Sequence, residues 1–327
     1  MPAPLKLLLP NKLVMITSRT EVGLPFVATI YMNLILWGIL ARAQALYPVK
    51  VVAFLFMANH LHLLAVVKEP DDLVAFMDRV KTESAHAINH LLGRRRRTVW
   101  QSGFDAPTIL TLEDAIDKLV YIYTNPQSAH LVDSIDNYPG VSSWQMFTQG
   151  QFSKTCKVIR RPSIQPLSDT ALSTAEQETL ARRLSDEAIL EETFTLSPDL
   201  WLDCYSISDP EKVKYYNDLV LKRVREREDE LRSIRAKSEK TTMGEARLAA
   251  QAIDQPYTPT KFGRRMWCIC WDKALRKSFI AFVKTLIAAG REVLASWRCG
   301  DTSRRYPPGL FPPSVPKVCN IFSPEYG

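Results

Sequence analysis

Two apolar runs of β type lie almost end to end in this sequence, and they constrain its fold more than any other feature. VKVVAFLFM (residues 49–57) and HLHLLAVV (residues 60–67) are separated by only two residues. Runs of this kind with so short a connection predict an antiparallel hairpin. Because side chains alternate along a strand, His60 and His62 point to one face of the hairpin and Leu61 points to the other.

Further elements around the hairpin indicate a small α+β unit. We expect a strand over residues 12–18 and helices over 26–46, 70–93 and 111–125. The order is β-α-β-β-α-(β)-α, with the bracketed strand short, and Pro126 is expected to end the last helix. Antiparallel pairing of these strands, with the helices on one face, predicts a ferredoxin-like or RRM-like sheet.

The sequence changes in character after about residue 150, which divides it into domains 1–150 and 151–327. The second part is expected to be a mainly α-helical extension. It begins with an irregular polar stretch over 151–175 and ends in an extended proline-rich tail over 304–317. The expected helices cover residues 174–194, 209–253 and 264–297.

Charge and composition narrow the classes of function. The net charge is +7, and residues 254–327 carry 12 basic and 5 acidic side chains, which suits a polyanionic partner. The six cysteines form no CxxC pair, as is typical of reduced thiols in a cytosolic protein. The most apolar stretch, residues 24–48, has an apolar core too short to span a bilayer. We therefore expect a cytoplasmic protein without a membrane partner.

The chemistry of the histidine pair depends on what lies beside it. Two imidazoles on one strand face suit a metal, although hydrogen-bonded structural histidines on a half-buried sheet are the more common case for such a pair alone. Tyr121 and Asn125 are four residues apart and so share a face of the helix expected over 111–125. Asn125 would add an oxygen ligand, and Tyr121 is a candidate nucleophile or, alternatively, a core aromatic.

Five short elements, in a fixed order, carry a resemblance to a known family. They are MANHLHLL (57–64), VKTESAHAIN (80–89), VWQSGFD (99–105), YIYTNP (121–126) and YPGVSSW (138–144). With these elements the first 150 residues resemble the IS200/IS605-like HUH transposases, most closely the REP-associated tyrosine transposases. Two positions depart from the pattern: Ala58 replaces the usual proline and Ser84 replaces an aromatic residue.

The resemblance implies a reaction and assigns roles to residues. His60, His62 and Asn125 would hold Mg²⁺ or Mn²⁺, and Tyr121 would attack the scissile phosphate to form a 5′-phosphotyrosine. Tyr123 faces elsewhere on the helix, so a single tyrosine is expected. The implied protein is a bacterial-type, nucleoid-associated enzyme that nicks and joins single-stranded or hairpin DNA, as a monomer or a homodimer.

Two alternatives to this activity stay open. The first is a domesticated DNA-binding protein of the same fold that recognises hairpin or palindromic DNA without transposing it. The second is a metal-dependent phosphoesterase that releases its product without a covalent link to the protein.

Basic segments outside this set are candidate DNA contacts. Arg94, Arg95, Arg96 and Arg97 precede Trp100 in an expected loop, which either contacts phosphates or is a solvated surface segment. Arg264, Arg265, Trp267 and Trp271 belong to a mixed basic and aromatic segment that would stack on unpaired bases. For that segment we favour a core-facing aromatic stripe. His86 and His90 are interpreted as residues of a polar helix face.

Overall fold

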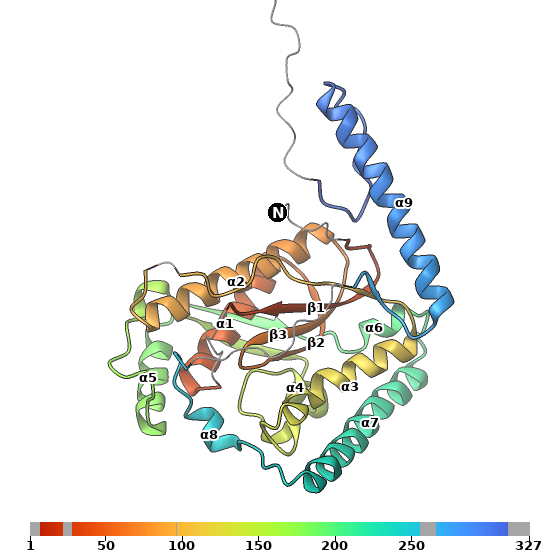
Figure 1. Cartoon of the computed structure of the whole chain (residues 1–327). Helices are drawn as coiled ribbons and strands as arrows, with labels where there is room; N and C mark the ends of the chain where they lie inside the picture. Colours follow the sequence, from red (N-terminus) through yellow and green to blue (C-terminus); the bar gives the residue numbers. More distant parts are fainter. Residues whose placement is uncertain (1–6, 22–27, 96, 256–265, 313–327) are drawn as a thin grey trace, which may run out of the picture.

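The computed structural model describes residues 7–21, 28–95, 97–255 and 266–312, with a five-stranded sheet at its centre (Figure 1). The strand order is β2-β3-β1-β4-β7. The strands are β1 (Leu13–Arg19), β2 (Lys50–Phe56), β3 (His60–Val66), β4 (Thr108–Ile109) and β7 (Cys268–Ile269). Neighbours pair antiparallel except β4 and β7, which are parallel. The expected α+β class is confirmed.

The predicted hairpin is the central feature of this sheet. β2 and β3 pair antiparallel, and the turn is closed by a 2.8 Å hydrogen bond from the Met57 amide to the His60 carbonyl. β1 pairs with the other edge of β3, which places Thr17 opposite His62 and Arg19 opposite His60. The histidines therefore lie at the end of β3 that adjoins the end of β1.

Helices cover both faces of the sheet. α1 (Ile30–Leu46) and α2 (Pro70–Leu91) lie on one face, where Leu61 is fully buried. α3 (Leu112–Ser128) lies on the other face, and α7 (Pro210–Lys237) runs alongside it (Figure 1). The expectation of helices on one face only is wrong, because β2 and β3 are apolar on both sides and each side needs a cover.

The ends of α3 matter because this helix carries Tyr121 and Asn125. The helix begins after Thr111, whose hydroxyl accepts a 3.2 Å hydrogen bond from the Asp114 amide, as a capping residue does. It continues through Pro126 to Ser128, and so ends three residues later than predicted. Proline removes one backbone donor, and here that loss falls in the last turn of the helix.

The extension contains a second small sheet that the sequence did not reveal. β5 (Ser153–Val158) pairs antiparallel with β6 (Leu190–Thr195), so neither the irregular stretch 151–175 nor the helix 174–194 is correct as predicted. The helix there, α5, covers only Thr174–Asp186. β6 packs against β2 of the central sheet through Phe194, whose ring centroid lies 5.4 Å from that of Phe54.

The other long helices are also shorter than predicted. The stretch 209–253 forms α7 and then the short α8 (Glu245–Ala249). The stretch 264–297 contains β7, and α9 (Lys273–Arg298) begins only after Asp272, which caps it. The shorter elements are η1 (Ile135–Asn137), α4 (Trp144–Gln149), η2 (Arg161–Ser163) and α6 (Leu200–Asp203). Within the described residues, no helix is long and apolar enough to cross a bilayer.

The extension contacts the first 150 residues at several places. β7 adds a strand to the central sheet, and β5 packs so closely on α1 that a side chain at Gly38 would collide with the carbonyl oxygen of Lys157. α7 packs along α3. The division into domains 1–150 and 151–327 stays a prediction. Arg264, Arg265 and residues 313–317 of the predicted tail lie outside the described residues.

Candidate active site

The two histidines of β3 lie side by side, as alternation along a strand requires. Their ring centroids are 4.5 Å apart, in an edge-to-face arrangement. His62 is only 4% exposed, whereas His60 is half-buried at the end of the strand. The pair therefore has a buried member and a member that reaches the surface.

Each imidazole is oriented through its Nδ1 atom. Nδ1 of His60 lies 2.7 Å from Oδ1 of Asn59, and Nδ1 of His62 lies 3.1 Å from Oγ1 of Thr17. A carboxamide oxygen only accepts, so Nδ1 of His60 donates and Nε2 of that ring keeps its lone pair. Nε2 of His62 is buried without a hydrogen-bond partner among the described residues.

Both imidazoles are held in the neutral form. Burial, together with the nearby positive charge of Arg19, lowers the pKa of His60 to about 4. Burial also lowers the pKa of His62 well below its usual value, helped by the charges of His60, Arg19 and Lys118. A neutral imidazole is the form that binds a metal ion.

The tyrosine helix brings Tyr121 against this pair. The Tyr121 ring centroid lies 5.4 Å from that of His62, and the side chain of Tyr121 is 43% exposed at the surface. The ammonium of Lys118 lies 5.3 Å from the centre of the Tyr121 ring. One chain thus supplies both the histidines and the tyrosine.

The Tyr121 hydroxyl is protonated at neutral pH. Burial raises the pKa of Tyr121, and the Asn125 carboxamide beside it and the charge of Arg19 offset this only in part. Asn125 is itself buried one turn further along α3, and its Nδ2 has no hydrogen-bond partner among the described residues. The hydroxyl must therefore lose a proton before or during any attack.

Tyr123 has no place in this site. It is buried on the other side of α3, where its hydroxyl lies 3.0 Å from Oγ of Ser143. Its ring packs against Trp144 and Phe147. Among the described residues, Tyr121 is the tyrosine that lies against the histidine pair.

The residues at the site fit a divalent metal, with part of the coordination supplied from outside the protein. Among the residues that the structure describes, no three or more His, Cys, Asp or Glu side chains come together as a metal cluster. A metal here would be held by two imidazole nitrogens and, after an amide rotation that presents its oxygen, by Asn125. Buried, unpartnered Nε2 of His62 is the observation that favours such a ligand.

The arginine loop lies at a separate hollow beside α2. Arg94, Arg95 and Arg97 line an open hollow of about 1080 Å³, and Arg96 lies outside the described residues. The remaining lining residues come from α2, from the loop after it and from η2, and they include no carboxylate; they are Thr82, Ala85, His86, Asn89, His90, Thr98, Arg161 and Pro162. His86 and His90 thus belong to a basic hollow.

Two aromatic residues differ from their sequence-based interpretation. Trp100 is 5% exposed and its indole donates a 2.9 Å hydrogen bond to Ser84, so its ring belongs to the core and offers no face to a base. Trp271, interpreted as part of a core-facing stripe, is 78% exposed. Its indole N–H donates to Asp117 of α3 at 3.1 Å, and its backbone N–H donates to Asp114 at 3.0 Å.

One family model matches the part of the chain that contains most of the sequence elements. Residues 26–124 match the family model described as transposase IS200 like. A solved structure described as a REP-associated tyrosine transposase bound to a REP hairpin is similar, with 18% identity and a TM-score of 0.40, over 46% of this chain and 86% of that one. No curated protein matches. The family match confirms the resemblance to the IS200-like transposases.

Proposed function

We propose that this chain, which is similar to the IS200-like transposases over its N-terminal part, cleaves and rejoins single-stranded DNA through a covalent bond to Tyr121. One observation carries the proposal: Tyr121 lies against His62, whose buried Nε2 has no partner among the described residues. A phenol beside two neutral imidazoles is a suitable arrangement for phosphoryl transfer to tyrosine.

The reaction is a pair of balanced transesterifications. The Tyr121 oxygen bonds to phosphorus as its proton leaves, and the bond to the 3′ oxygen breaks to give a 5′-phosphotyrosine and a free 3′-OH. A 3′-OH of another strand end then attacks the same phosphorus and releases Tyr121. The phosphodiester energy stays in the covalent link, so the joining step needs no nucleotide cofactor.

We further propose that His60, His62 and Asn125 hold Mg²⁺ or Mn²⁺. When bound, such an ion polarises the scissile phosphate. The protein's own contribution is orientation: Asn59 and Thr17 fix the two imidazole rings, and α3 fixes the phenol. The low pKa values keep both imidazoles free of competing protons at neutral pH.

DNA is proposed to contact two further parts of the protein surface. The hollow with Arg94, Arg95 and Arg97 would contact phosphates, and exposed Trp271 would stack on an unpaired base near Tyr121. Asp117, which holds the Trp271 ring, is one helical turn before Tyr121, or about 6 Å along the axis. Single-stranded or hairpin DNA in the cytoplasm or on the nucleoid is the partner we infer.

A covalent adduct is the decisive test. The wild-type protein is incubated with hairpin-flanked single-stranded DNA and Mn²⁺, and adducts are resolved on a denaturing gel. We expect an adduct that Tyr121→Phe abolishes and that the matched variant Tyr123→Phe retains. An adduct that survives in Tyr121→Phe, or its absence from the wild type, contradicts the proposal.

The same reactions, analysed on a denaturing gel and on a native gel, separate the alternatives. A domesticated DNA-binding protein would shift the DNA in a native gel yet form neither an adduct nor a nick. A phosphoesterase would nick the DNA without an adduct. Mixing Tyr121→Phe with His62→Ala tests whether one chain suffices: we expect no adduct from the mixture, because the tyrosine meets the histidines of its own chain.

A further inference from the structure

α7 lies along the flank of α3 that faces away from the central sheet (Figure 1). Val220 and Val224 on α7 are fully buried in the same apolar cluster as Ile116, Leu119 and Ile122 of α3. The residues of α3 in this shared cluster lie in the middle of the helix, before and after Tyr121 in the sequence. A helix of the extension therefore forms the outer wall of the helix that carries the tyrosine.

Charged contacts hold α7 against the first turns of α3. The Arg223 guanidinium pairs with Glu113 in the first turn and lies 3.9 Å from Asp117. Asp117 is also the residue that holds the indole of Trp271. The beginning of α3 is thus fixed from the side of α7 as well as by its own cap.

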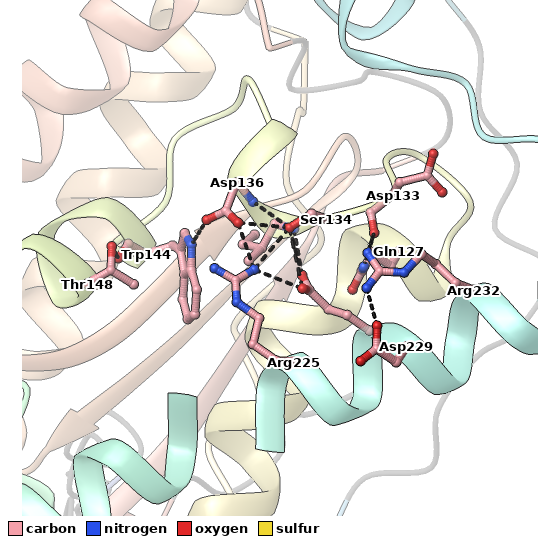
Figure 2. A network of polar contacts seen from close by, with 11 residues as sticks. Gln127, Asp133, Ser134, Asp136, Trp144, Thr148, Arg225, Asp229 and Arg232 are labelled. Atoms are coloured by element: carbon pink, nitrogen blue, oxygen red, sulfur yellow. Dashed lines mark hydrogen bonds and ion pairs between the residues drawn. The ribbon is translucent and has the colours of Figure 1, made fainter. Parts of the chain in front are cut away.

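A buried carboxylate holds the loop that follows α3. Glu228 of α7 is 1% exposed and accepts hydrogen bonds from the Ile135 amide at 2.9 Å and the Ser134 hydroxyl at 3.1 Å. Arg225 donates to the same carboxylate at 2.9 Å and pairs with Asp136 at 2.7 Å (Figure 2). A buried carboxylate with these donors is costly to leave unpaired, so the loop and α7 move together.

A second chain of contacts leads from this loop back into α3. Gln127, buried two residues after Asn125, donates from Nε2 to the Asp133 carbonyl (Figure 2). The Asp133 carboxylate pairs with Arg235 of α7. α3 is therefore held by α7 at its first turn, along its middle and at its last turn.

We propose that α7 is a brace that positions the tyrosine helix, and that Glu228 is its central positioning residue. The inference rests on the proposed function, because it concerns the placement of Tyr121. Glu228 does not touch the reacting atoms; it acts through the 133–136 loop on α3. A shift of about 1 Å in a reacting group is enough to cost a factor of about 100 in rate, so a loosened brace slows attack without removing the DNA-binding surface.

The kinetic test compares three variants at saturating hairpin-flanked DNA with Mn²⁺. Glu228→Ala removes the carboxylate, and Glu228→Gln keeps an acceptor for the Ile135 amide. Glu226→Ala is the matched control, since exposed Glu226 pairs only loosely with Lys222. We expect the rate of adduct formation to fall about tenfold or more in Glu228→Ala, and less in Glu228→Gln. The Kd for DNA should stay within about twofold of wild type.

A rate in both Glu228 variants equal to that of Glu226→Ala overturns the proposal. So does an equal loss of rate and DNA affinity, because that pattern indicates general unfolding. Circular dichroism and thermal melting establish that each variant is folded. If Glu228→Ala does not fold, Glu228→Gln alone decides between these outcomes.

A second readout does not depend on cleavage. With 3-fluorotyrosine at position 121, the ¹⁹F resonance reports how the ring lies beside His62. We expect Glu228→Gln to shift or broaden this resonance and Glu226→Ala to leave it unchanged. An unchanged resonance in Glu228→Gln overturns the brace. A wild type that forms no adduct overturns the proposed function, and the ¹⁹F spectra still decide whether α7 positions Tyr121.

Discussion

Arginines occupy two contrasting settings in this molecule. On α7, Arg223, Arg225, Arg227, Arg232 and Arg235 each pair with a carboxylate. In the loop after α2, Arg94, Arg95 and Arg97 line an open hollow, and the described residues provide no ion pair for them. The arginines of α7 form ion pairs within the protein, whereas the charges of Arg94, Arg95 and Arg97 are available to bind a partner.

This contrast shows that the number of arginines in a segment does not by itself locate a site for a polyanion. Residues 151–253 contain 17 basic and 18 acidic side chains, and each arginine of α7 pairs with a carboxylate of α7, of α3 or of the loop after α3. The first 150 residues have a net charge of only +1, yet they contain Arg94, Arg95 and Arg97, for which the described residues provide no ion pair. Positive potential is available to DNA where arginines have no carboxylate partner, and those positions are known only from the folded structure.

The largest effect is expected from removing the hollow's charge. Replacing Arg94, Arg95 and Arg97 together with alanine should weaken binding of single-stranded DNA about 10- to 100-fold. The dependence of log K on log salt should also become less steep by about 2, since each phosphate contact contributes about 0.7. Fluorescence anisotropy across a salt series measures both. An unchanged salt slope would remove the distinction between the two sets of arginines.

A buried arginine of α7 should show the opposite signature. The Arg235 side chain is almost fully buried while its partner Asp133 is largely exposed, so Arg235→Ala is expected to lower the free energy of unfolding by about 1–3 kcal/mol. DNA affinity of the folded variant should equal that of wild type. Urea denaturation and anisotropy test this together, and a loss of affinity without a loss of stability would contradict it.

Local periodicity was enough to predict which side chains of the candidate site share a face, whereas their roles came from the family resemblance. Alternation placed His60 and His62 on one strand face, and four-residue spacing placed Tyr121 and Asn125 on one helix face. The predictions failed where the decisive partner is distant in sequence. Glu228 accepts a hydrogen bond from Ser134, which is 94 residues away in the sequence, and no sequence pattern around Glu228 predicts that contact.

The same limit explains the misread elements of the extension. The segment LEETFT of β6 is rich in glutamate, which favours a helix in isolation. Phe194 overrides that preference, because its ring packs against those of both Trp37 and Phe54. Likewise the exposure of Trp271 depends on its hydrogen bonds to α3, more than 150 residues earlier.

Arg161 is intermediate between the paired arginines of α7 and the arginines of the loop after α2. It lines the hollow, yet its guanidinium makes two hydrogen bonds to Glu83, at 2.7 and 2.9 Å. Arg161→Ala is therefore expected to weaken DNA binding only about two- to threefold. Glu83→Gln should strengthen binding by a similar factor, because it frees the charge of Arg161. Weaker binding in Glu83→Gln, measured by anisotropy, would show that the pair is needed as a unit.

The smallest effect is expected at Arg227, which makes it the strictest test of the comparison. Arg227 is exposed on α7 and pairs with Glu230, three residues along the same helix. Such surface pairs contribute about 0.5 kcal/mol or less, so Arg227→Ala should barely change the unfolding midpoint in urea. It removes the same charge as each substitution in the hollow. If net charge alone governed binding, Arg227→Ala would weaken DNA affinity as much as Arg95→Ala does. We expect the same affinity as wild type for Arg227→Ala, because its charge is already neutralised by Glu230.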